Sequence, residues 1–447
     1  MSDLVKDAKE PRTSVELFAG GGGLAMAVHQ AGFRPLLFNE FNKRACETLV
    51  ASAKKTLGED GLKITEDTKP VPPGQGQPAP LYPGDVRDLD LSGFEGKVDI
   101  LAGGPPCQPF SAGGVAKGDE DKRNMFPAVF KAVREMRPKA VICENVRGLL
   151  RPSFAEYFKY IQNELRLPFE KRDDEVPWHE HNAHLNRILG TLSDDKGSSD
   201  RYRVVMIPVN AANYGVPQVR NRVVLIAFRT DLNVDVEAFE KEVKTQRFSE
   251  AALLRSMRAE DGPYWQRHTT VPGYIREEIR RQIPKVIKED DCQPWRTLRD
   301  AIQGYGTDVK LPALPEVDLE RLDEKFDFGD EVGVVDHIGW PGARIYKGHT
   351  PNRLDRPAKT VKAGVHGVPG GESVMLLDQR VKTSEDWVHL HRYMTVRETA
   401  RVMTFPDEWL GSGPRGEQMR QLGNAVPVAL GEFFAKAVAE ALDKAEG

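Results

Sequence analysis

The first half of this chain alternates short apolar segments with segments that repeat apolar residues at helical spacing, and few folds accommodate that alternation. We expect strands at residues 15–18, 36–38, near 81, at 98–102 and at 140–143. Between the last two, apolar residues recur every three or four positions from Met125 to Met136, and Pro138 ends the segment. A strand, a helix and another strand in this order predict a parallel sheet wrapped by helices.

Two later segments extend the predicted sheet. Residues 203–209 and 223–228 have the composition of strands, and the turn-rich residues 213–217 join them. Such a connection favours an antiparallel pair. We therefore predict an α/β fold with a doubly wound, Rossmann-like sheet that is mostly parallel and has an antiparallel final strand.

The remainder of the chain predicts a second, smaller domain. Residues 1–230 form the first domain in this interpretation, and from 231 to 417 the regular pattern is lost among prolines and scattered tryptophans. Residues 418–447 carry an apolar stripe at helical spacing, so we expect a helix that packs back on the first domain. Segments 68–80 and 152–200 are interpreted as a surface loop and a largely helical insertion.

The charge balance excludes a molecule that is basic as a whole. The 447 residues include 63 lysines and arginines against 67 aspartates and glutamates, a net charge of −4, so any surface for nucleic acid must be local. Such a surface is predicted between residues 339 and 367, where the basic residues are Arg344, Lys347, Arg353, Arg356, Lys359 and Lys362. A solvated loop explains this cluster equally well.

The cysteines and the N-terminus bear on the compartment. The four cysteines lack the spacing of a disulfide framework or a zinc site, which fits a reducing environment. The N-terminus is charged, and no apolar run reaches membrane-spanning length. We therefore expect a cytoplasmic protein without a membrane span.

A glycine-rich segment follows the first predicted strand and opens a helix, where glycines let the backbone approach a ligand closely. It contains Phe18, Ala19, Gly20, Gly22, Gly23 and Leu24. Glu40 ends the second strand, where an acid can accept hydrogen bonds from ribose, and Asp85 follows the third, where it can accept from an adenine amino group. The alternatives are a tight turn without a ligand and a nicotinamide or flavin site, since Gly20, Gly22 and Ala25 match a loose dinucleotide fingerprint.

Cys107 follows the fourth strand between prolines and glycines, so we expect it at the sheet edge where open α/β folds bind ligands. A thiolate there is a nucleophile if nearby cations lower its pKa, whereas the other three cysteines are interpreted as buried apolar residues. Glu144 leaves the fifth strand at the same edge. Gln218, Arg220 and Arg222 alternate into the last strand, and a period of two places them on one face, where they supply cations.

Taken in order, these blocks resemble those of the cytosine carbon-5 DNA methyltransferases of bacterial restriction-modification systems. The matching segments are 18–23, Glu40, 84–85, 105–108, 144–146, 214–222, 397–407 and 421–426. They span nearly the whole chain and leave the insertions and residues 231–390 without clear counterparts. In that family the latter stretch is the target-recognition domain.

The resemblance implies a DNA (cytosine-5-)-methyltransferase, which transfers a methyl group from S-adenosylmethionine to cytosine in a specific double-stranded DNA sequence and releases S-adenosylhomocysteine. In this family Cys107 would attack carbon 6 of a cytosine flipped out of the helix, Glu144 would protonate ring nitrogen 3, and Arg222 would support the ring. Gln218 and Arg220 would complete the catalytic set. Addition at carbon 6 makes carbon 5 nucleophilic, so no metal is required.

The resemblance also implies contacts beyond the reacting groups. Phe41 takes the place of a ring that often lies against adenine. Further cofactor contacts fall at Val86, Pro106, Asn424, Ala425 and Val426. Ser111 opens a segment that resembles the family's catalytic loop, so it is expected to touch DNA together with the basic residues 344–362. The expected partners are double-stranded DNA and a cognate restriction endonuclease that acts separately, and we expect a monomer.

Three other functions stay open at this point. A DNA-occupying subunit would keep the fold without catalysis, an RNA cytosine methyltransferase would have a similar fold, and a nicotinamide or flavin oxidoreductase would share the glycine-rich loop. The combination of Cys107, Glu144 and Arg222 argues against the first and the third, because neither gives all three residues a role.

Overall fold

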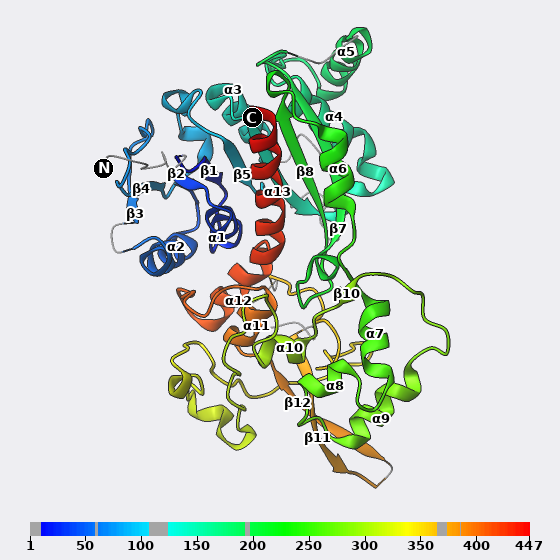
Figure 1. Cartoon of the computed structure of the whole chain (residues 1–447). Helices are drawn as coiled ribbons and strands as arrows, with labels where there is room; N and C mark the ends of the chain where they lie inside the picture. Colours follow the sequence, from blue (N-terminus) through cyan, green and yellow to red (C-terminus); the bar gives the residue numbers. More distant parts are fainter. Residues whose placement is uncertain (1–9, 59–60, 107–123, 193–196, 364–372, 385) are drawn as a thin grey trace, which may run out of the picture.

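The computed structural model describes residues 10–58, 61–106, 124–192, 197–363, 373–384 and 386–447. Cys107, Gln108 and Ser111, with the rest of the predicted catalytic loop, lie outside the described residues. In Figure 1 the described chain forms two bodies, an upper one built on a large sheet and a lower one of short helices, loops and a hairpin.

Eight strands of the described chain form the large sheet, in the order β3-β4-β2-β1-β5-β6-β8-β7. Their bounds are β1 Thr13–Leu17, β2 Arg34–Asn39, β3 Leu62–Ile64, β4 Ala79–Tyr82, β5 Ile100–Gly103, β6 Ala140–Val146, β7 Tyr202–Asn210 and β8 Asn221–Arg229. β8 runs antiparallel to β6 and β7, whereas the other neighbouring strands are parallel. The predicted fold class is confirmed, and β3 is an addition that the sequence pattern did not predict.

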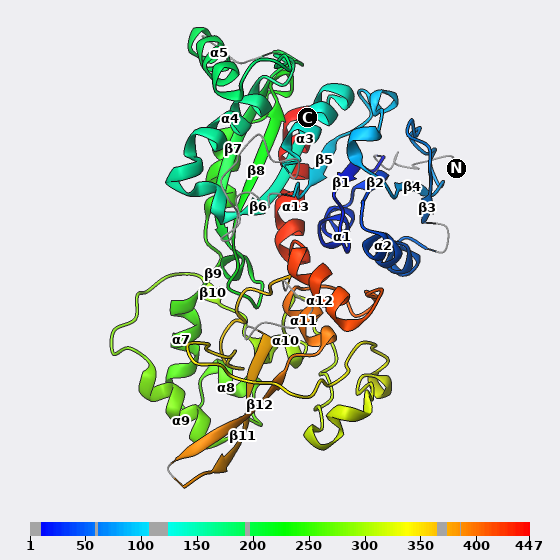
Figure 2. The ribbon, with the colours of Figure 1, turned by 180° about the vertical axis from the view of Figure 1, so that it is seen from behind.

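Helices cover both faces of this sheet (Figures 1 and 2). One face packs against α1 (Gly23–Gln30), α2 (Lys43–Thr56), α6 (Val236–Lys244) and α13 (Val428–Glu446). The other packs against α3 (Phe126–Met136), α4 (Ala155–Arg166) and α5 (Trp178–Thr191). Because both faces are buried, the central strands are apolar on both sides, which explains their nearly continuous apolar runs.

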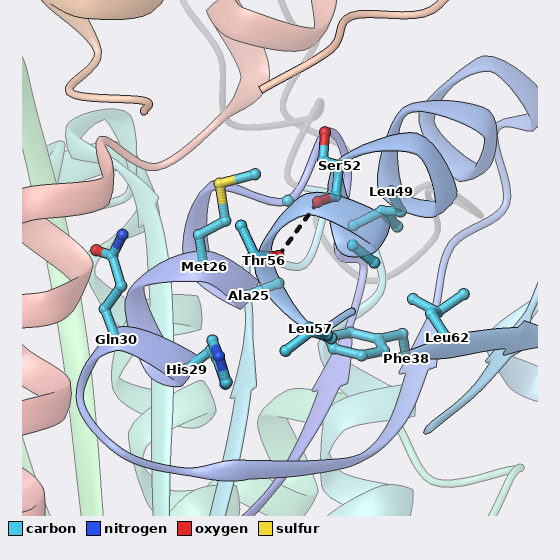
Figure 3. Close-up of a pocket in the computed structure, with 12 residues that line it drawn as sticks. Ala25, Met26, His29, Gln30, Phe38, Leu49, Ser52, Thr56, Leu57 and Leu62 are labelled. Atoms are coloured by element: carbon cyan, nitrogen blue, oxygen red, sulfur yellow. Dashed lines mark hydrogen bonds between the residues drawn. The ribbon is translucent and has the colours of Figure 1, made fainter. Parts of the chain in front are cut away.

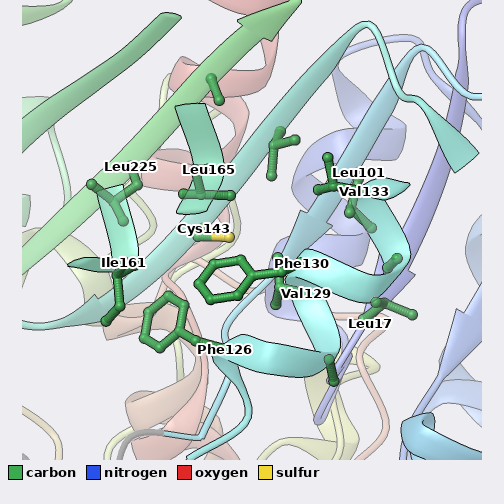
Figure 4. Packing of buried hydrophobic residues seen from close by; sticks show 14 of the residues in the cluster. Leu17, Leu101, Phe126, Val129, Phe130, Val133, Cys143, Ile161, Leu165 and Leu225 are labelled. Carbon is green, nitrogen blue, oxygen red and sulfur yellow. The ribbon is translucent and has the colours of Figure 1, made fainter. Parts of the chain in front are cut away.

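The apolar residues that recur at helical spacing in α3 pack against the sheet. Phe126, Phe130 and Val133 share one side of α3 and meet Leu101 and Cys143 of the sheet (Figure 4). Each of these five side chains is at most 3 % exposed. The helical spacing seen in the sequence therefore marks the face of α3 that covers the sheet.

Helix α6 changes the proposed domain boundary. Phe239 and Val243 of α6 lie in the same apolar cluster as Phe434 and Val438 of α13 and Phe228 of β8. The chain therefore stays with the large sheet beyond residue 230, and we propose that the second domain begins after α6. Helix α13 lies beside α1 in both views (Figures 1 and 2), and we propose that it belongs to the first domain.

The lower body holds short elements around a two-stranded hairpin. Its helices are α7 (Glu250–Arg258), α8 (Pro263–Arg267), α9 (Gly273–Gln282) and α10 (Leu298–Ile302), and α11 (Val396–Val402) and α12 (Arg415–Asn424) lie where it meets the upper body. β9 (Phe248–Ser249) pairs with β10 (Gln293–Pro294), and β11 (Val374–Lys382) pairs with β12 (Trp387–Tyr393). None of the helices in the described ranges combines the length and apolar composition needed to cross a bilayer.

Candidate active site at the carboxyl ends of the strands

The glycine-rich loop after β1 takes an unusual backbone path. Phe18, Gly20 and Gly22 all lie in the left-handed region, with φ of 58°, 57° and 91°. For an aromatic residue this conformation costs about 1–3 kcal/mol, and such strain is common where backbone groups are arranged around a ligand. The Ala19 amide donates to the carbonyl of Asn39 at 3.0 Å, which fastens the loop to the end of β2.

Glu40 lies where the sequence predicts it, at the end of β2 beside this loop. Its two carboxylate oxygens accept hydrogen bonds from the amides of Gly20 at 2.7 Å and Asn42 at 2.6 Å. The neighbouring Phe41 is 76 % exposed, which is unusual for a phenylalanine. A planar ligand held by Glu40 would therefore find an uncovered aromatic ring next to it.

Asn39 orders the third strand end, a role that the sequence analysis missed. Its side-chain amide donates to the carbonyls of Tyr82 at 3.2 Å and Gly84 at 2.8 Å, and so fixes the turn that leads to Asp85. Asp85 accepts hydrogen bonds from the guanidinium of Arg87, which holds the pKa of that carboxyl below its usual value. The predicted adenine acceptor is therefore present as a carboxylate, with an arginine as its present partner.

Glu16 is a second residue that the sequence analysis missed. It lies on β1 and is 3 % exposed. Burial raises its pKa well above the usual range, although a hydrogen bond from the Ala25 amide acts in the opposite direction. The contact ties the first turn of α1 to the sheet directly behind the glycine-rich loop. The sequence did contain a signal for Glu16, because it is a charged residue inside an otherwise apolar strand.

The C-terminal segment closes the loop from the other side. A Cβ placed on Gly23 would lie 2.3 Å from the carbonyl oxygen of Val426, so no side chain fits there. Asn424 is exposed, Ala425 is half-buried, and Val426 and Leu24 are buried. The residues predicted from the two ends of the chain to hold a cofactor therefore do lie together.

The strands that lead to the reactive residues run side by side. Gly103 of β5 is paired with Cys143 of β6, so the residues after each strand leave the sheet together. The side-chain amide of Asn145 donates to the carbonyl of Pro105 at 3.0 Å. Pro106, the last described residue before Cys107, is exposed. The described backbone thus leads toward Cys107 from beside the end of β6.

Glu144 and Arg222 form an ion pair at this edge. The Nε atom of Arg222 lies 2.9 Å from Oε1 of Glu144, and their side chains are 13 % and 10 % exposed. The geometry does not make a hydrogen bond, and Oε1 of Glu144 has no hydrogen-bond partner among the described residues. The carboxyl group is therefore charge-paired through Oε1, which is buried and makes no hydrogen bond to the described residues.

Gln218 and Arg220 point elsewhere. β8 begins at Asn221, so the period of two does not extend back to them. Gln218 is buried and accepts a hydrogen bond from the amide of Val361 at 3.1 Å. Arg220 donates to backbone carbonyls of the C-terminal half of the chain. These contacts give both residues a structural role rather than the predicted catalytic one.

The described cysteines are poor nucleophiles. Burial raises the pKa of Cys143 to about 12, and burial together with the charge of Glu40 raises that of Cys46 to about 12. Cys292, predicted as buried, is only half-buried, and burial and Asp290 raise its pKa. None of these three thiols forms an appreciable thiolate at neutral pH.

The basic segment divides into free and paired side chains. Arg344 and Lys347 are exposed and form no ion pair among the described residues. By contrast, Arg353 lies 3.4 Å from Glu278, and Arg356 lies 2.9 Å from Glu250. Lys359 donates to Thr350, and Lys362 is exposed.

A cavity of about 310 Å³ opens between α1 and α2 (Figure 3). Its lining is mostly apolar and includes Met26, Phe38, Leu49 and Leu57, with His29 at one side. Neither Glu40 nor the other strand-end carboxylates contribute to it. The cavity borders the glycine-rich loop at Gly22 but is not lined by the acidic residues of the site described above.

The chain is similar to known proteins over nearly its whole length. The family model described as C-5 cytosine-specific DNA methylase matches residues 12–73, 77–167 and 176–440. The chain is 29% identical over 446 residues to the type II methyltransferase M.PspPI of Psychrobacter sp. (strain TA137), covering 98% of this chain and 82% of that one. It is 26% identical over 499 residues to the DNA (cytosine-5-)-methyltransferase M.ApeKI of Aeropyrum pernix, covering 96% and 99%.

A solved structure supports the fold alone. A DNA modification methyltransferase encoded within an Escherichia coli prophage superposes with a TM-score of 0.53 at 18% identity, covering 97% of this chain and 99% of that one. Since the family model matches most of the chain, the chain belongs to the C-5 cytosine-specific DNA methylase family and is a DNA (cytosine-5-)-methyltransferase.

Proposed function

We propose that this enzyme methylates one cytosine within a specific double-stranded DNA sequence, with S-adenosylmethionine as donor and Cys107 as covalent nucleophile. The observation that carries the proposal is the ion pair of Glu144 and Arg222 at the strand ends, beside the segment that leads to Cys107. The high pKa values of the other cysteines favour Cys107 as the nucleophile.

The proposed chemistry follows from the electronic structure of cytosine. The Cys107 thiolate forms a bond to carbon 6 while Glu144 delivers a proton to ring nitrogen 3, which converts the ring to an enamine with a nucleophilic carbon 5. When bound, S-adenosylmethionine supplies a methyl group on a sulfonium, a good leaving group. Carbon 5 takes that methyl group, loss of the carbon 5 proton to a base expels the Cys107 thiolate, and ring nitrogen 3 returns its proton to Glu144, which restores the ring.

Arg222 serves Glu144 in this proposal. Its guanidinium keeps a positive charge beside the carboxyl group, which stabilises the carboxylate left after proton delivery. Because both side chains are nearly buried, their interaction is less screened than it would be at the surface. A cytosine placed between them and Cys107 must first leave the DNA stack, since carbon 6 is inaccessible in a duplex.

The described residues fit the cofactor. Glu40 offers carboxylate oxygens for ribose hydroxyls, the exposed ring of Phe41 offers a surface for adenine, and Asp85 offers an acceptor for the adenine amino group. Gly23 leaves no room for a side chain, so the loop and Val426 stay in contact. We assign no metal to the reaction, because the proposed steps need only protons and a thiolate.

The partners follow from the relatives. Several are named type II methyltransferases, and we propose that this chain likewise protects a DNA sequence that a separate endonuclease cuts. Action as a monomer in the cytoplasm remains a prediction.

Transfer of tritium from labelled S-adenosylmethionine to unmethylated DNA tests the proposal, with transfer RNA as the competing substrate. We expect incorporation into DNA only, none with Cys107→Ser, and a denaturation-resistant complex with target DNA containing 5-fluorocytosine, since fluorine cannot leave as a cation. Incorporation by Cys107→Ser, or a preference for transfer RNA, would refute the assignment. Bisulfite sequencing of host DNA then identifies the target.

A further inference from the structure

Arg220 is a buried arginine without an acidic partner. Its side chain is 1 % exposed, the nearby Glu144 pairs with Arg222 instead, and the Nε of Arg220 has no hydrogen-bond partner among the described residues. Instead, Nη1 donates to the carbonyl of Val361 at 2.9 Å, and Nη2 donates to the carbonyls of Gly423 and Ala425, each at 2.9 Å. Burial, together with the positive charge of Arg222 and against the negative charge of Glu144, lowers the pKa of this guanidinium to about 9.

A group that is costly to bury should have a role that a neutral residue would not fill. The planar guanidinium directs its donors at fixed angles, so it holds several carbonyls in one arrangement, which the single point charge of lysine cannot do. The three carbonyls belong to segments that lie 141 and more than 200 residues away in the sequence. Arg220 therefore fixes the relative positions of parts of the chain that nothing in the sequence joins.

Each of these segments leads to a different part of the proposed function. Gly423 and Ala425 flank Asn424, which is expected to contact the cofactor. Val361 continues the segment that carries the exposed basic residues. Arg220 itself is two residues from Arg222, the partner of Glu144. The guanidinium of Arg220 thus contacts the turn expected to bind the cofactor and the segment expected to bind DNA, and Arg220 lies next to the strand that carries Arg222.

The contact between these segments is tight and reinforced. A Cβ on Gly423 would lie 2.3 Å from the amide nitrogen of Ala363, so the two backbones are in direct contact. Ala358 donates to the Pro217 carbonyl at 2.9 Å, and Val219 donates to the Ala358 carbonyl at 2.8 Å. A shift of the recognition segment on DNA would therefore be transmitted to the turn at Asn424 and to the strand of Arg222.

We infer that Arg220 is a positioning residue that couples cofactor binding to DNA binding. The inference rests on the proposed function, because it takes the turn at Asn424 as part of the cofactor site. Coupling is reciprocal, so each ligand should bind more tightly in the presence of the other, and both effects should depend on Arg220.

The test measures the affinity for S-adenosylhomocysteine by calorimetry, with and without excess unmethylated plasmid DNA. For the wild type we expect DNA to tighten binding about tenfold. For Arg220→Met we expect binding without DNA to weaken about tenfold, the loss of roughly one charge-assisted hydrogen bond, and the enhancement by DNA to disappear. Arg220→Lys should recover affinity in part without restoring the enhancement.

Two matched variants separate positioning from other effects. Arg401→Met removes a buried arginine whose carbonyl and carboxylate acceptors lie at Ile302, Pro312 and Asp407, so it should lower stability but keep the enhancement. Arg222→Lys should slow methyl transfer but should also keep the enhancement of cofactor binding by DNA. An enhancement retained in Arg220→Met, or absent from the wild type, would overturn the inference, whereas a failure of the proposed function would show as absent methyl incorporation by the wild type.

Discussion

The indole Nε1 of Trp409 donates a 2.8 Å hydrogen bond to the carbonyl of Gly21, 388 residues earlier in the chain. Trp409 is fully buried, and its ring lies against the glycine-rich loop at Gly21. The loop that is expected to hold the cofactor is therefore shaped by residues near the C-terminus as much as by its own glycines.

Gly23→Ala should disrupt the contact between the glycine-rich loop and Val426. The new methyl group would lie 2.3 Å from the Val426 carbonyl, so we expect a loss of about 2–3 kcal/mol in the free energy of unfolding. Affinity for S-adenosylhomocysteine should fall with it. Gly20→Ala is the matched control, because a Cβ there meets no atom within 4 Å and only the left-handed φ of 57° is strained, at a cost of about 1 kcal/mol. Equal losses in urea unfolding would contradict this explanation.

Phe41→Ala should weaken cofactor binding without changing stability. The ring is 76 % exposed, so its removal takes little buried surface from the protein. Stacking on adenine contributes about 0.5–1.5 kcal/mol beyond area, so we expect about a 3- to 10-fold loss of affinity for S-adenosylhomocysteine. Phe41→Trp should keep the affinity. Val71, which is 74 % exposed, gives the control Val71→Ala, and an unchanged affinity in Phe41→Ala would exclude the proposed stacking.

Glu144→Gln should abolish methyl transfer while leaving the cofactor site intact. The amide cannot deliver a proton to ring nitrogen 3, so we expect a fall in kcat of about 100- to 10,000-fold. Binding of S-adenosylhomocysteine should be unchanged, since Glu144 lies at the base site beside Arg222. Single-turnover measurements with saturating DNA are the appropriate assay, and a fall of less than tenfold would remove Glu144 from the proton transfer.

The double variant Arg344→Ala with Lys347→Ala should weaken DNA binding in a salt-dependent manner. Both side chains are exposed and lack ion pairs among the described residues. If each contacts one phosphate, the slope of log affinity against log salt should fall by about 2. The control is Arg353→Ala with Arg356→Ala, whose side chains already pair with Glu278 and Glu250 and should change the slope less. If the control variant lowered the slope more than Arg344→Ala with Lys347→Ala, the phosphate contacts would have to be assigned to Arg353 and Arg356.

Acid should weaken the folded state through Glu398. Burial alone raises the pKa of this carboxyl, but its ion pair with Arg392 outweighs burial and lowers the pKa from 4.5 to about 2. Its contribution is therefore present above pH 4.5 and is lost as the pH falls toward 2, by about 3 kcal/mol. Replacing both residues, Glu398→Gln with Arg392→Met, should flatten this part of the pH dependence of unfolding. An unchanged slope would show that other carboxylates dominate.

The sequence by itself determined the fold class, because strand and helix patterns are local and the apolar runs of β1, β5 and β6 match strands buried on both faces. It also predicted that Glu40 and Glu144 lie toward the carboxyl ends of neighbouring segments of the sheet, and Glu40 follows β2 while Glu144 lies near the end of β6. The tertiary structure decided which arginine meets Glu144. Arg220 and Arg222 have the same chemistry and lie two positions apart, but β8 begins only at Asn221, so one faces Glu144 and the other the carbonyls of Val361, Gly423 and Ala425. Contacts across 141 to 388 residues leave no periodic trace in the sequence, and for that reason the sequence could not show them.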